Sequence, residues 1–189
     1  PPMLRATFTL LTGGALAQLV PLLLGPVLPR LFSPAAFGLF TAFATIAASV
    51  AVVACARYEY ALPMAHDDAE AAALLSLALR IWVGVVALSV PLAWVLHAAG
   101  RLAVAWALPL SVAATGLLQL LMMWSNRAEA YGALAASRFV QYAGAALLQV
   151  ALGWWLWRGS AAGADAAWAL VLGPVIAVAL AAPLLARTA

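Results

Sequence analysis

Residues 57–70 read Arg-Tyr-Glu-Tyr-Ala-Leu-Pro-Met-Ala-His-Asp-Asp-Ala-Glu and hold five of the fifteen charged residues of the chain. Residues 35–56 before them carry no charge, and residues 71–99 after them carry only Arg80. Each flanking stretch is at least as long as the roughly 20 apolar residues that cross a bilayer as a helix. The sequence here therefore predicts a polar turn between two membrane-spanning helices.

The composition of the whole chain is that of a membrane protein. Of the 189 residues, 68% are hydrophobic and 8% are charged, and the mean hydropathy is +1.08, whereas soluble domains average about 45–50% apolar and about 25% charged residues. The nine basic residues are all arginines and are scattered singly, so they form no basic stripe of the kind that binds nucleic acid. Cys55 is the only cysteine, which excludes an internal disulfide, and no spacing of His, Cys and acidic residues fits a zinc site. We expect no cofactor.

Six apolar runs are long enough to span a bilayer. We predict an all-α, polytopic fold in which residues 1–189 form one unit, with spans at about residues 6–28, 36–56, 71–97, 102–124, 134–157 and 166–186. Pro21, Pro26 and Pro29 predict that the first span is kinked or broken, because proline removes a backbone donor. Ala15 to Ala17 resemble a signal-peptide cleavage site, but the apolar run continues to residue 28, so we expect a retained anchor.

Local signals predict where several helices begin and end. Ser33 followed by Pro34 is typical of a helix N-cap and first helical position. Pro63 is expected to stop any extension of the second span. Asp67 followed by Glu70 has the spacing of a cap with a reciprocal acid, so the third helix is predicted to begin near residue 68.

The distribution of the arginines predicts the orientation. With a cytoplasmic N-terminus, six arginines fall on the inner side and three on the outer side: Arg5, Arg57, Arg80, Arg127, Arg138 and Arg187 against Arg30, Arg101 and Arg158. Inner loops of membrane proteins carry the excess of basic residues. We therefore expect both termini in the cytoplasm.

Polar side chains within the apolar segments are the candidate binding residues. Charged residues and amides in spans usually face the bundle interior or a cavity, and the arginine fork suits phosphate because it donates two parallel hydrogen bonds. For each arginine alone a lipid-headgroup or topology-setting role is the stronger interpretation, and Arg80 could either snorkel to the interface or face a cavity. Together they predict a transporter with a cationic, amide-lined cavity built from Arg57, Arg80, Arg138, Gln18, Gln119, Gln141 and Gln149.

An acidic cluster offers a different function. Asp67, Asp68 and Glu70 could serve an intramembrane polyprenyl-phosphate or sugar transferase, but such chemistry needs carboxylates from more than one segment to hold magnesium. Glu129 and Asp165 are the only acids further along the chain and are assigned to opposite sides. Helix capping is the favoured interpretation of the cluster, and a non-catalytic membrane assembly subunit is a third hypothesis.

The sequence has three separated motifs, at residues 16–21 with 28–40, at 57–63 with 67–71, and at 126–131 with Ser137, Arg138 and Gln141. Together they resemble bacterial polysaccharide biosynthesis flippases, the Wzx-like O-antigen and exopolysaccharide translocases of the MOP superfamily. The first has a proline-bearing helix followed by an arginine, an aliphatic residue, an aromatic residue, Ser-Pro and an aromatic-Gly pair. The second lies between spans two and three, and the third surrounds the loop between spans four and five. The three motifs cover most of residues 7–150 in this order.

The resemblance implies a transporter rather than an enzyme. It would flip an oligosaccharide carried on undecaprenyl diphosphate across the bacterial inner membrane, with Arg57, Arg80, Arg138, Gln18 and Gln141 contacting the substrate and Glu59 as a possible partner of Arg57. Members of the family have two six-helix lobes related as parallel repeats, and this chain corresponds to the first. We therefore expect a second lobe or a second copy to complete the cleft.

Overall fold

The computed structural model describes residues 2–100, 102–158 and 166–186, and this part of the chain is an all-helical bundle with no strands. The elements are α1 Pro2–Leu24, α2 Leu28–Leu31, α3 Pro34–Val52, the 3-10 helix η1 Tyr58–Met64, α4 Asp68–Ala98, the 3-10 helix η2 Ala105–Ala107, α5 Leu108–Arg127, α6 Tyr131–Arg158 and α7 Ala167–Ala186. Six of the helices are long and apolar enough to cross a membrane. The prediction of six such helices is confirmed.

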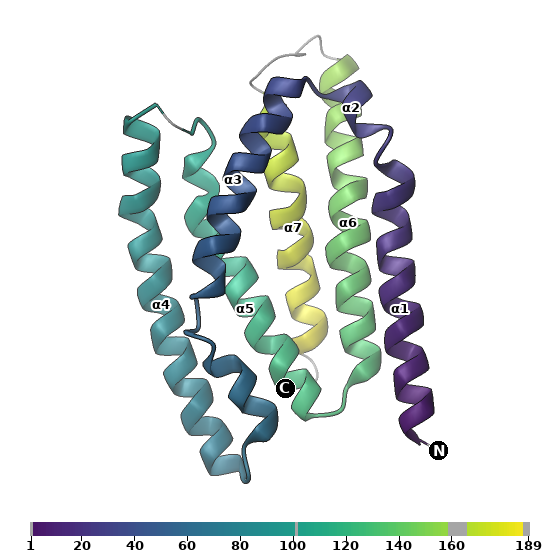
Figure 1. The fold of residues 1–189 in the computed structure, drawn as a ribbon, viewed down its shortest axis with the longest axis vertical. Helices are drawn as coiled ribbons and strands as arrows, with labels where there is room; N and C mark the ends of the chain where they lie inside the picture. Colours follow the sequence, from purple (N-terminus) through teal and green to yellow (C-terminus); the bar gives the residue numbers. More distant parts are fainter. Residues whose placement is uncertain (1, 101, 159–165, 187–189) are drawn as a thin grey trace.

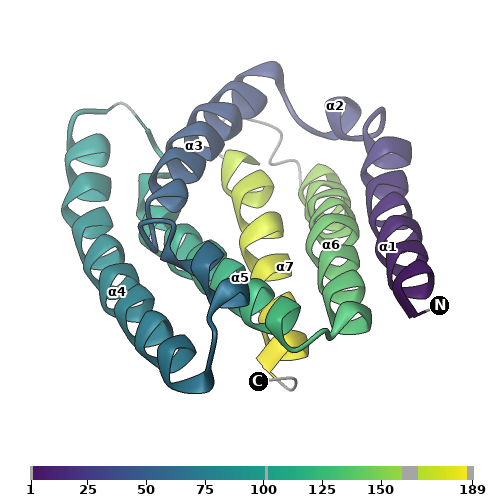
Figure 2. The ribbon, with the colours of Figure 1, turned by 60° about the horizontal axis from the view of Figure 1, so that its bottom comes forward.

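The helices stand side by side and alternate in direction, so the start of α1 and the end of α7 lie at the same end of the bundle (Figure 1). Helix α7 lies in the middle and packs on α3, α5 and α6. Helix α1 packs mainly on α6, and α4 packs mainly on α5 and η1. The view from the lower end shows α1 and α4 at opposite flanks (Figure 2). Which side of a membrane this end faces stays a prediction.

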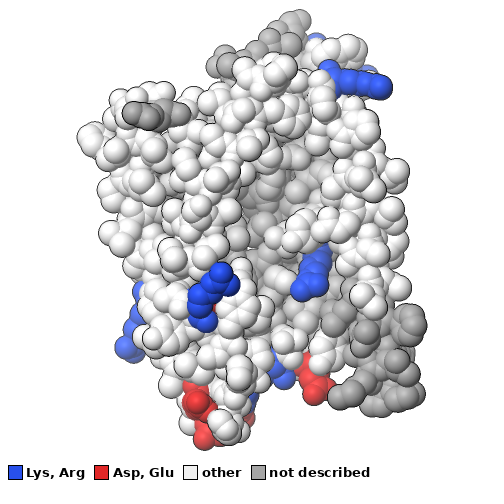
Figure 3. Space-filling view, in the orientation of Figure 1, with Lys and Arg blue, Asp and Glu red and all other residues white. Residues whose placement is uncertain are grey.

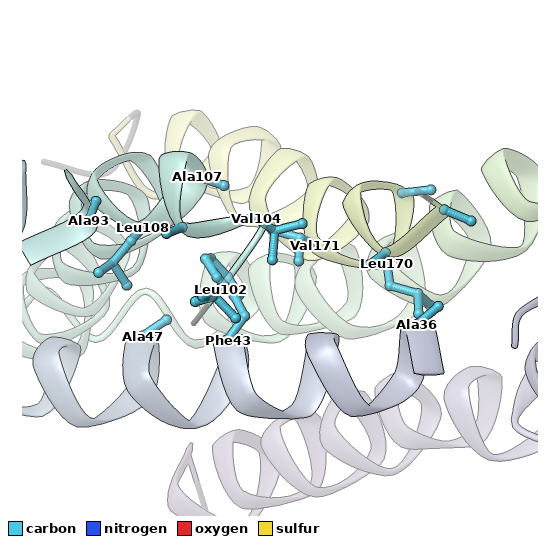
Figure 4. Close-up of a cluster of buried hydrophobic side chains, with 14 of the residues drawn as sticks. Ala36, Phe43, Ala47, Ala93, Leu102, Val104, Ala107, Leu108, Leu170 and Val171 are labelled. Carbon is cyan, nitrogen blue, oxygen red and sulfur yellow. The ribbon is translucent and has the colours of Figure 1, made fainter. Parts of the chain in front are cut away.

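The main core lies where α3 crosses α7 and the start of α5. Phe43 of α3, Leu108 of α5 and Val171 of α7 are buried in it, and Figure 4 shows them with their neighbours. Small residues allow the helices to approach closely elsewhere. A Cβ atom added to Gly13 of α1 would lie 2.7 Å from the Cβ of Ala135 of α6, so this crossing has no room for a larger residue.

Two predicted helix starts are confirmed in atomic detail. The Ser33 hydroxyl accepts from the backbone N–H of Ala36 at 3.2 Å, and the Asp67 carboxylate accepts from the N–H of Glu70 at 2.6 Å. In a capping box Glu70 would accept from the backbone N–H of Asp67. Here Glu70 Oε2 accepts instead from the backbone N–H of the preceding residue, His66, at 2.8 Å. The third long helix consequently begins at residue 68, as expected.

The predicted break in the first span is also present. Helix α1 ends at Leu24, residues 25–27 form a turn, and Pro29 then lies in the short helix α2. The backbone N–H of Gly25 donates to Pro21 at 2.8 Å and closes the last turn of α1. Proline at 26 cannot donate in the same way, so the chain changes direction there.

The predicted end of the second span is wrong. We expected it to continue to about residue 56 with Pro63 as the stop, but α3 ends at Val52. Ala56 and Arg57 then adopt left-handed backbone angles, with φ of 47° and 66°, and these separate α3 from η1. The chain turns back only between η1 and α4 (Figure 1). Pro63 lies inside η1, so residues 58–64 form a short helix of their own in place of a simple turn. The other spans differ from expectation by a few residues at their ends.

Candidate ligand-binding cleft

A cleft of about 330 Å³ lies between α1, α5, α6 and η1. The face of the molecule shown in Figure 3 is hollowed between its two flanks, with basic side chains beside the hollow and acidic side chains gathered at the lower end. We call this feature the polar cleft. Its walls are formed by Gly14, Ala17, Gln18, Tyr60, Gln119, Met122, Met123, Arg138, Gln141 and Tyr142.

The same spacing recurs on all three helices of the polar cleft. Each contributes residues at positions i, i+3 and i+4, which lie on one face of an α-helix. The sets are 14, 17 and 18 on α1, then 119, 122 and 123 on α5, then 138, 141 and 142 on α6. Gly14 and Ala17 of α1 are small and leave the cleft open, and the longer side chains of α5 and α6 extend into it.

Among the described residues, Arg138 is the one charged side chain on the walls, and none of the wall residues is acidic. Neither of the ion pairs between described residues involves it; these join His66 to Glu70 and Arg127 to Asp68. A guanidinium offers five N–H donors in a fixed plane. The cleft therefore carries a net positive charge and has unused donors.

Tyr60 connects the polar cleft to its rim. The Gln119 amide donates to the Tyr60 hydroxyl oxygen at 2.9 Å, so the hydroxyl proton is free to donate to a ligand. The Arg57 guanidinium lies over the ring of Tyr60, with its central carbon 5.3 Å from the ring centroid. Such a cation–π contact holds the Arg57 charge next to the cleft.

The structure brings together only part of the set of residues predicted from the sequence. Gln18, Arg138 and Gln141 line the polar cleft, and Arg57 lies at its rim. Arg80 does not line it: the side chain is exposed on α4, which packs mainly on α5 and η1 rather than on α1 or α6. The roles of the lining residues in binding stay predictions.

Glu59 also lies outside the polar cleft and does not pair with Arg57. The residue is only 2% exposed, and its Oε2 atom has no hydrogen-bond partner among the described residues. The turn of η1 directs it into the protein while Arg57 covers the ring of Tyr60. The expected partnership of Arg57 and Glu59 is replaced by a contact between Arg57 and an aromatic ring.

Gln149 has a structural role. Pro174 of α7 has no N–H to donate to the carbonyl four residues earlier, that of Leu170. The Gln149 amide donates to this carbonyl oxygen at 2.8 Å. The side chain, only 7% exposed, therefore satisfies a backbone acceptor that the proline leaves free, and it takes no part in the cleft.

The acidic cluster is engaged in local structure. Asp67 and Glu70 cap the start of α4, and Asp68 accepts from Arg127 at 3.0 Å. The same arginine donates to the carbonyl oxygens of Leu62 and Ala65, so it ties η1 to the end of α5. Within the described ranges no group of three or more His, Cys, Asp or Glu residues could hold a metal ion.

Sequence reasoning did not single out Tyr60, Tyr142 or the two methionines as site residues. Tyrosine and methionine are common in apolar segments, so composition gives no signal for them. The positions three and four residues after Gln119 and Arg138 include both methionines and Tyr142, whereas Tyr60 lies on η1 and has no such signal.

No family model matches the chain, and no curated protein or solved structure matches it. The geometry of the polar cleft and the sequence motifs are therefore the basis on which a function is proposed.

Proposed function

We propose that this chain is the first lobe of a MOP-type flippase that moves an oligosaccharide linked to a polyprenyl diphosphate across the bacterial inner membrane. The observation that carries the proposal is Arg138, a cation that forms no ion pair with a described residue and lies in an open cleft whose other polar groups are amides and phenols. The motifs that resemble polysaccharide flippases support it independently.

The polar cleft suits an anionic headgroup. Arg138 can form two parallel charge-assisted bonds to phosphate oxygens, and the Tyr60 hydroxyl and the amides of Gln18 and Gln141 can donate beside it. None of the wall residues that the structure describes is a carboxylate, so these residues do not repel an anion. The same amides and phenols can also bind sugar hydroxyls, which both donate and accept.

The position of the polar cleft suits transport. Arg138 lies seven residues after the first residue of α6, about 10 Å along the helix axis at 1.5 Å per residue. An ionisable side chain of a membrane-spanning helix that faces a cavity, as Arg138 does, marks a substrate or ion path. The cleft is open along one side of the six-helix unit, where a second lobe or a second copy would complete a passage.

The test is transport by the full-length protein that contains this chain, reconstituted into vesicles with a fluorescent lipid-linked oligosaccharide. Access of a membrane-impermeant glycosidase or lectin to the sugar reports its movement between leaflets. We expect Arg138→Ala to slow this movement about tenfold or more, the loss expected when charge-assisted hydrogen bonds are removed. Arg138→Lys should retain part of the rate because it keeps the charge.

Arg80→Ala is the matched control, because it removes an arginine from an exposed site outside the polar cleft. Its rate should equal that of the unchanged protein. The same variants should show the same order of surface polysaccharide in a strain that lacks its own flippase. Unchanged transport with Arg138→Ala, or an equal loss with Arg80→Ala, would contradict the proposal.

A further inference from the structure

The link between α3 and η1 holds the backbone in an unfavourable conformation. Ala56 and Arg57 are adjacent residues with φ of 47° and 66°. Such angles are uncommon for residues that have a Cβ atom, and alanine and arginine are not among the types enriched there. They persist only where the surrounding structure enforces them, and they cluster at ligand clamps and switch regions. Residues 56–57 are therefore a candidate hinge.

The helix that follows this hinge is weakly bonded. η1 is a 3-10 helix of seven residues, whereas such helices seldom exceed three or four residues because their hydrogen bonds are poorly aligned. The N–H of Ala65 donates to the Leu62 carbonyl oxygen at 3.4 Å. Pro63 lies inside η1 and has no N–H to donate. Its own backbone hydrogen bonds therefore do little to hold η1 in its present form.

Glu59 adds a second cost to the present position of η1. Its side chain is 2% exposed, and Oε2 has no hydrogen-bond partner among the described residues. Cys55 and Leu62, which flank it in the sequence, are buried in an apolar cluster with residues of α4 and α5. A buried polar atom without a partner is unfavourable. A movement that lifts η1 from the bundle would let water reach this oxygen.

Contacts with α5 hold the two ends of η1, which lies at the lower end of the bundle between α4 and α5 (Figure 1). At its end, the Arg127 guanidinium donates to the carbonyl oxygens of Leu62 and Ala65, at 3.4 and 2.7 Å. Near its start, the Gln119 amide donates to the Tyr60 hydroxyl oxygen at 2.9 Å, in an exposed position. The end is thus anchored by a cation, and the start by one neutral bond that water can replace.

We propose that η1 is a lid on the polar cleft, which pivots on its Arg127 anchor and bends at the hinge. In the closed position Tyr60 forms part of the cleft wall, and Arg57 lies over its ring. Opening moves both residues away from a bound anion. The anion therefore stabilises the closed position, and the strain at the hinge favours release. This inference rests on the proposed function and describes how the same site is regulated.

The experiment uses the full-length protein in nanodiscs, with inorganic pyrophosphate as the probe. Hydrogen exchange of a peptide that covers η1 reports how often the lid opens, and titration calorimetry reports the affinity for pyrophosphate. We expect the η1 peptide to exchange faster than a peptide from the middle of α5, because local opening exposes its amides. Pyrophosphate should slow this exchange, and it should not do so in Arg138→Ala.

Two replacements at the exposed Ala56 shift the lid in opposite directions. Asparagine is enriched in left-handed conformations, whereas a β-branched residue is a strong outlier there. Ala56→Asn should slow exchange of η1 about fivefold, and Ala56→Val should speed it about fivefold. Pyrophosphate binding should tighten in the first variant and weaken in the second, by about two- to fivefold, because affinity scales with the closed fraction.

Glu129→Asp is the matched control. Glu129 has a φ of 54° in the turn between α5 and α6, and aspartate is also enriched in left-handed conformations. The replacement eases a similar strain and keeps the charge, but it does not touch the hinge. Exchange of η1 and pyrophosphate affinity should both stay unchanged.

The outcomes separate the lid from the proposed function. If Arg138→Ala weakens pyrophosphate binding but the Ala56 variants leave it unchanged, the lid is refuted and the headgroup site stands. Exchange of η1 that is as slow as that of α5, or that pyrophosphate does not slow, also refutes the lid. If Ala56→Val does not fold, Ala56→Asn alone decides between these results. If pyrophosphate binding does not depend on Arg138, the proposed function itself fails.

Discussion

Replacing Gln149 by Met tests whether this amide supports the backbone at Pro174. Methionine keeps the length of the side chain but removes the donor that bonds to the Leu170 carbonyl at 2.8 Å. A buried acceptor left unpaired costs about 1–3 kcal/mol, and hydrogen bonds within membrane bundles average about 0.6 kcal/mol. We expect a loss of about 1–2 kcal/mol, a fall in Tm of roughly 2–8 °C for a chain of this size.

The decisive measurement is a double-mutant cycle. Pro174→Ala restores a backbone N–H that can donate to the Leu170 carbonyl, so Gln149→Met should cost far less in that background. Thermal unfolding in detergent of the four proteins measures the coupling. Gln141→Met is the matched control on the same helix, because Gln141 makes no hydrogen bond to a described residue and lines the polar cleft. An equal cost of Gln149→Met with and without Pro174 would refute the reasoning.

Two further predictions concern a close contact and a thiol. An added Cβ at Gly153 would lie 2.6 Å from the buried ring of Phe32, so Gly153→Ala should lower the free energy of unfolding by about 1–3 kcal/mol. Gly84→Ala is the control and should not lower it, because an added Cβ there would have nothing within 4 Å. Equal Tm values for the two variants would contradict the prediction. Burial, with a smaller contribution from Glu59, raises the pKa of Cys55 from 9.0 to about 11. Alkylation by iodoacetamide at pH 8 should be at least about 100-fold slower than in the unfolded chain, because only the thiolate reacts and the side chain is only 2% exposed. The rate should rise with pH up to pH 10, and a rate equal to that of the unfolded chain would contradict the prediction.

The number of helices and several of their starts could be predicted because they depend on local chemistry. Uninterrupted apolar runs define the six long helices, and the side chains of Ser33 and Asp67 cap the helices that follow them. The end of α3 could not be predicted in the same way. The chain remains apolar to residue 56, and the break between α3 and η1 uses left-handed angles at Ala56 and Arg57, positions where no glycine signals a turn.

The residues that line the cleft could be predicted only as a class. Arg80 and Arg138 are both arginines within long apolar helices, and the rule that buried polar groups face a cavity selects both. Helix α4 is apolar on every side, so its sequence does not show which face packs and which is exposed. The packing of α4 on α5 and η1 leaves Arg80 outside, and this depends on contacts between residues far apart in the sequence.

The wall residues of the polar cleft have the same spacing on three helices. Arg138 is followed at three and four residues by Gln141 and Tyr142, and the same spacing recurs in the wall residues of α1 and α5. Arg80 is followed at these positions by Val83 and Gly84, and none of these three residues lines the polar cleft. Since a polar cavity in an apolar bundle must be lined from several helices at once, one polar residue on one helix is weak evidence for a site. Gln119 is likewise followed by apolar residues, Met122 and Met123, so the sequence alone does not separate it from Arg80. The packing of the helices does, because it places Gln119 on the wall of the cleft and leaves Arg80 outside.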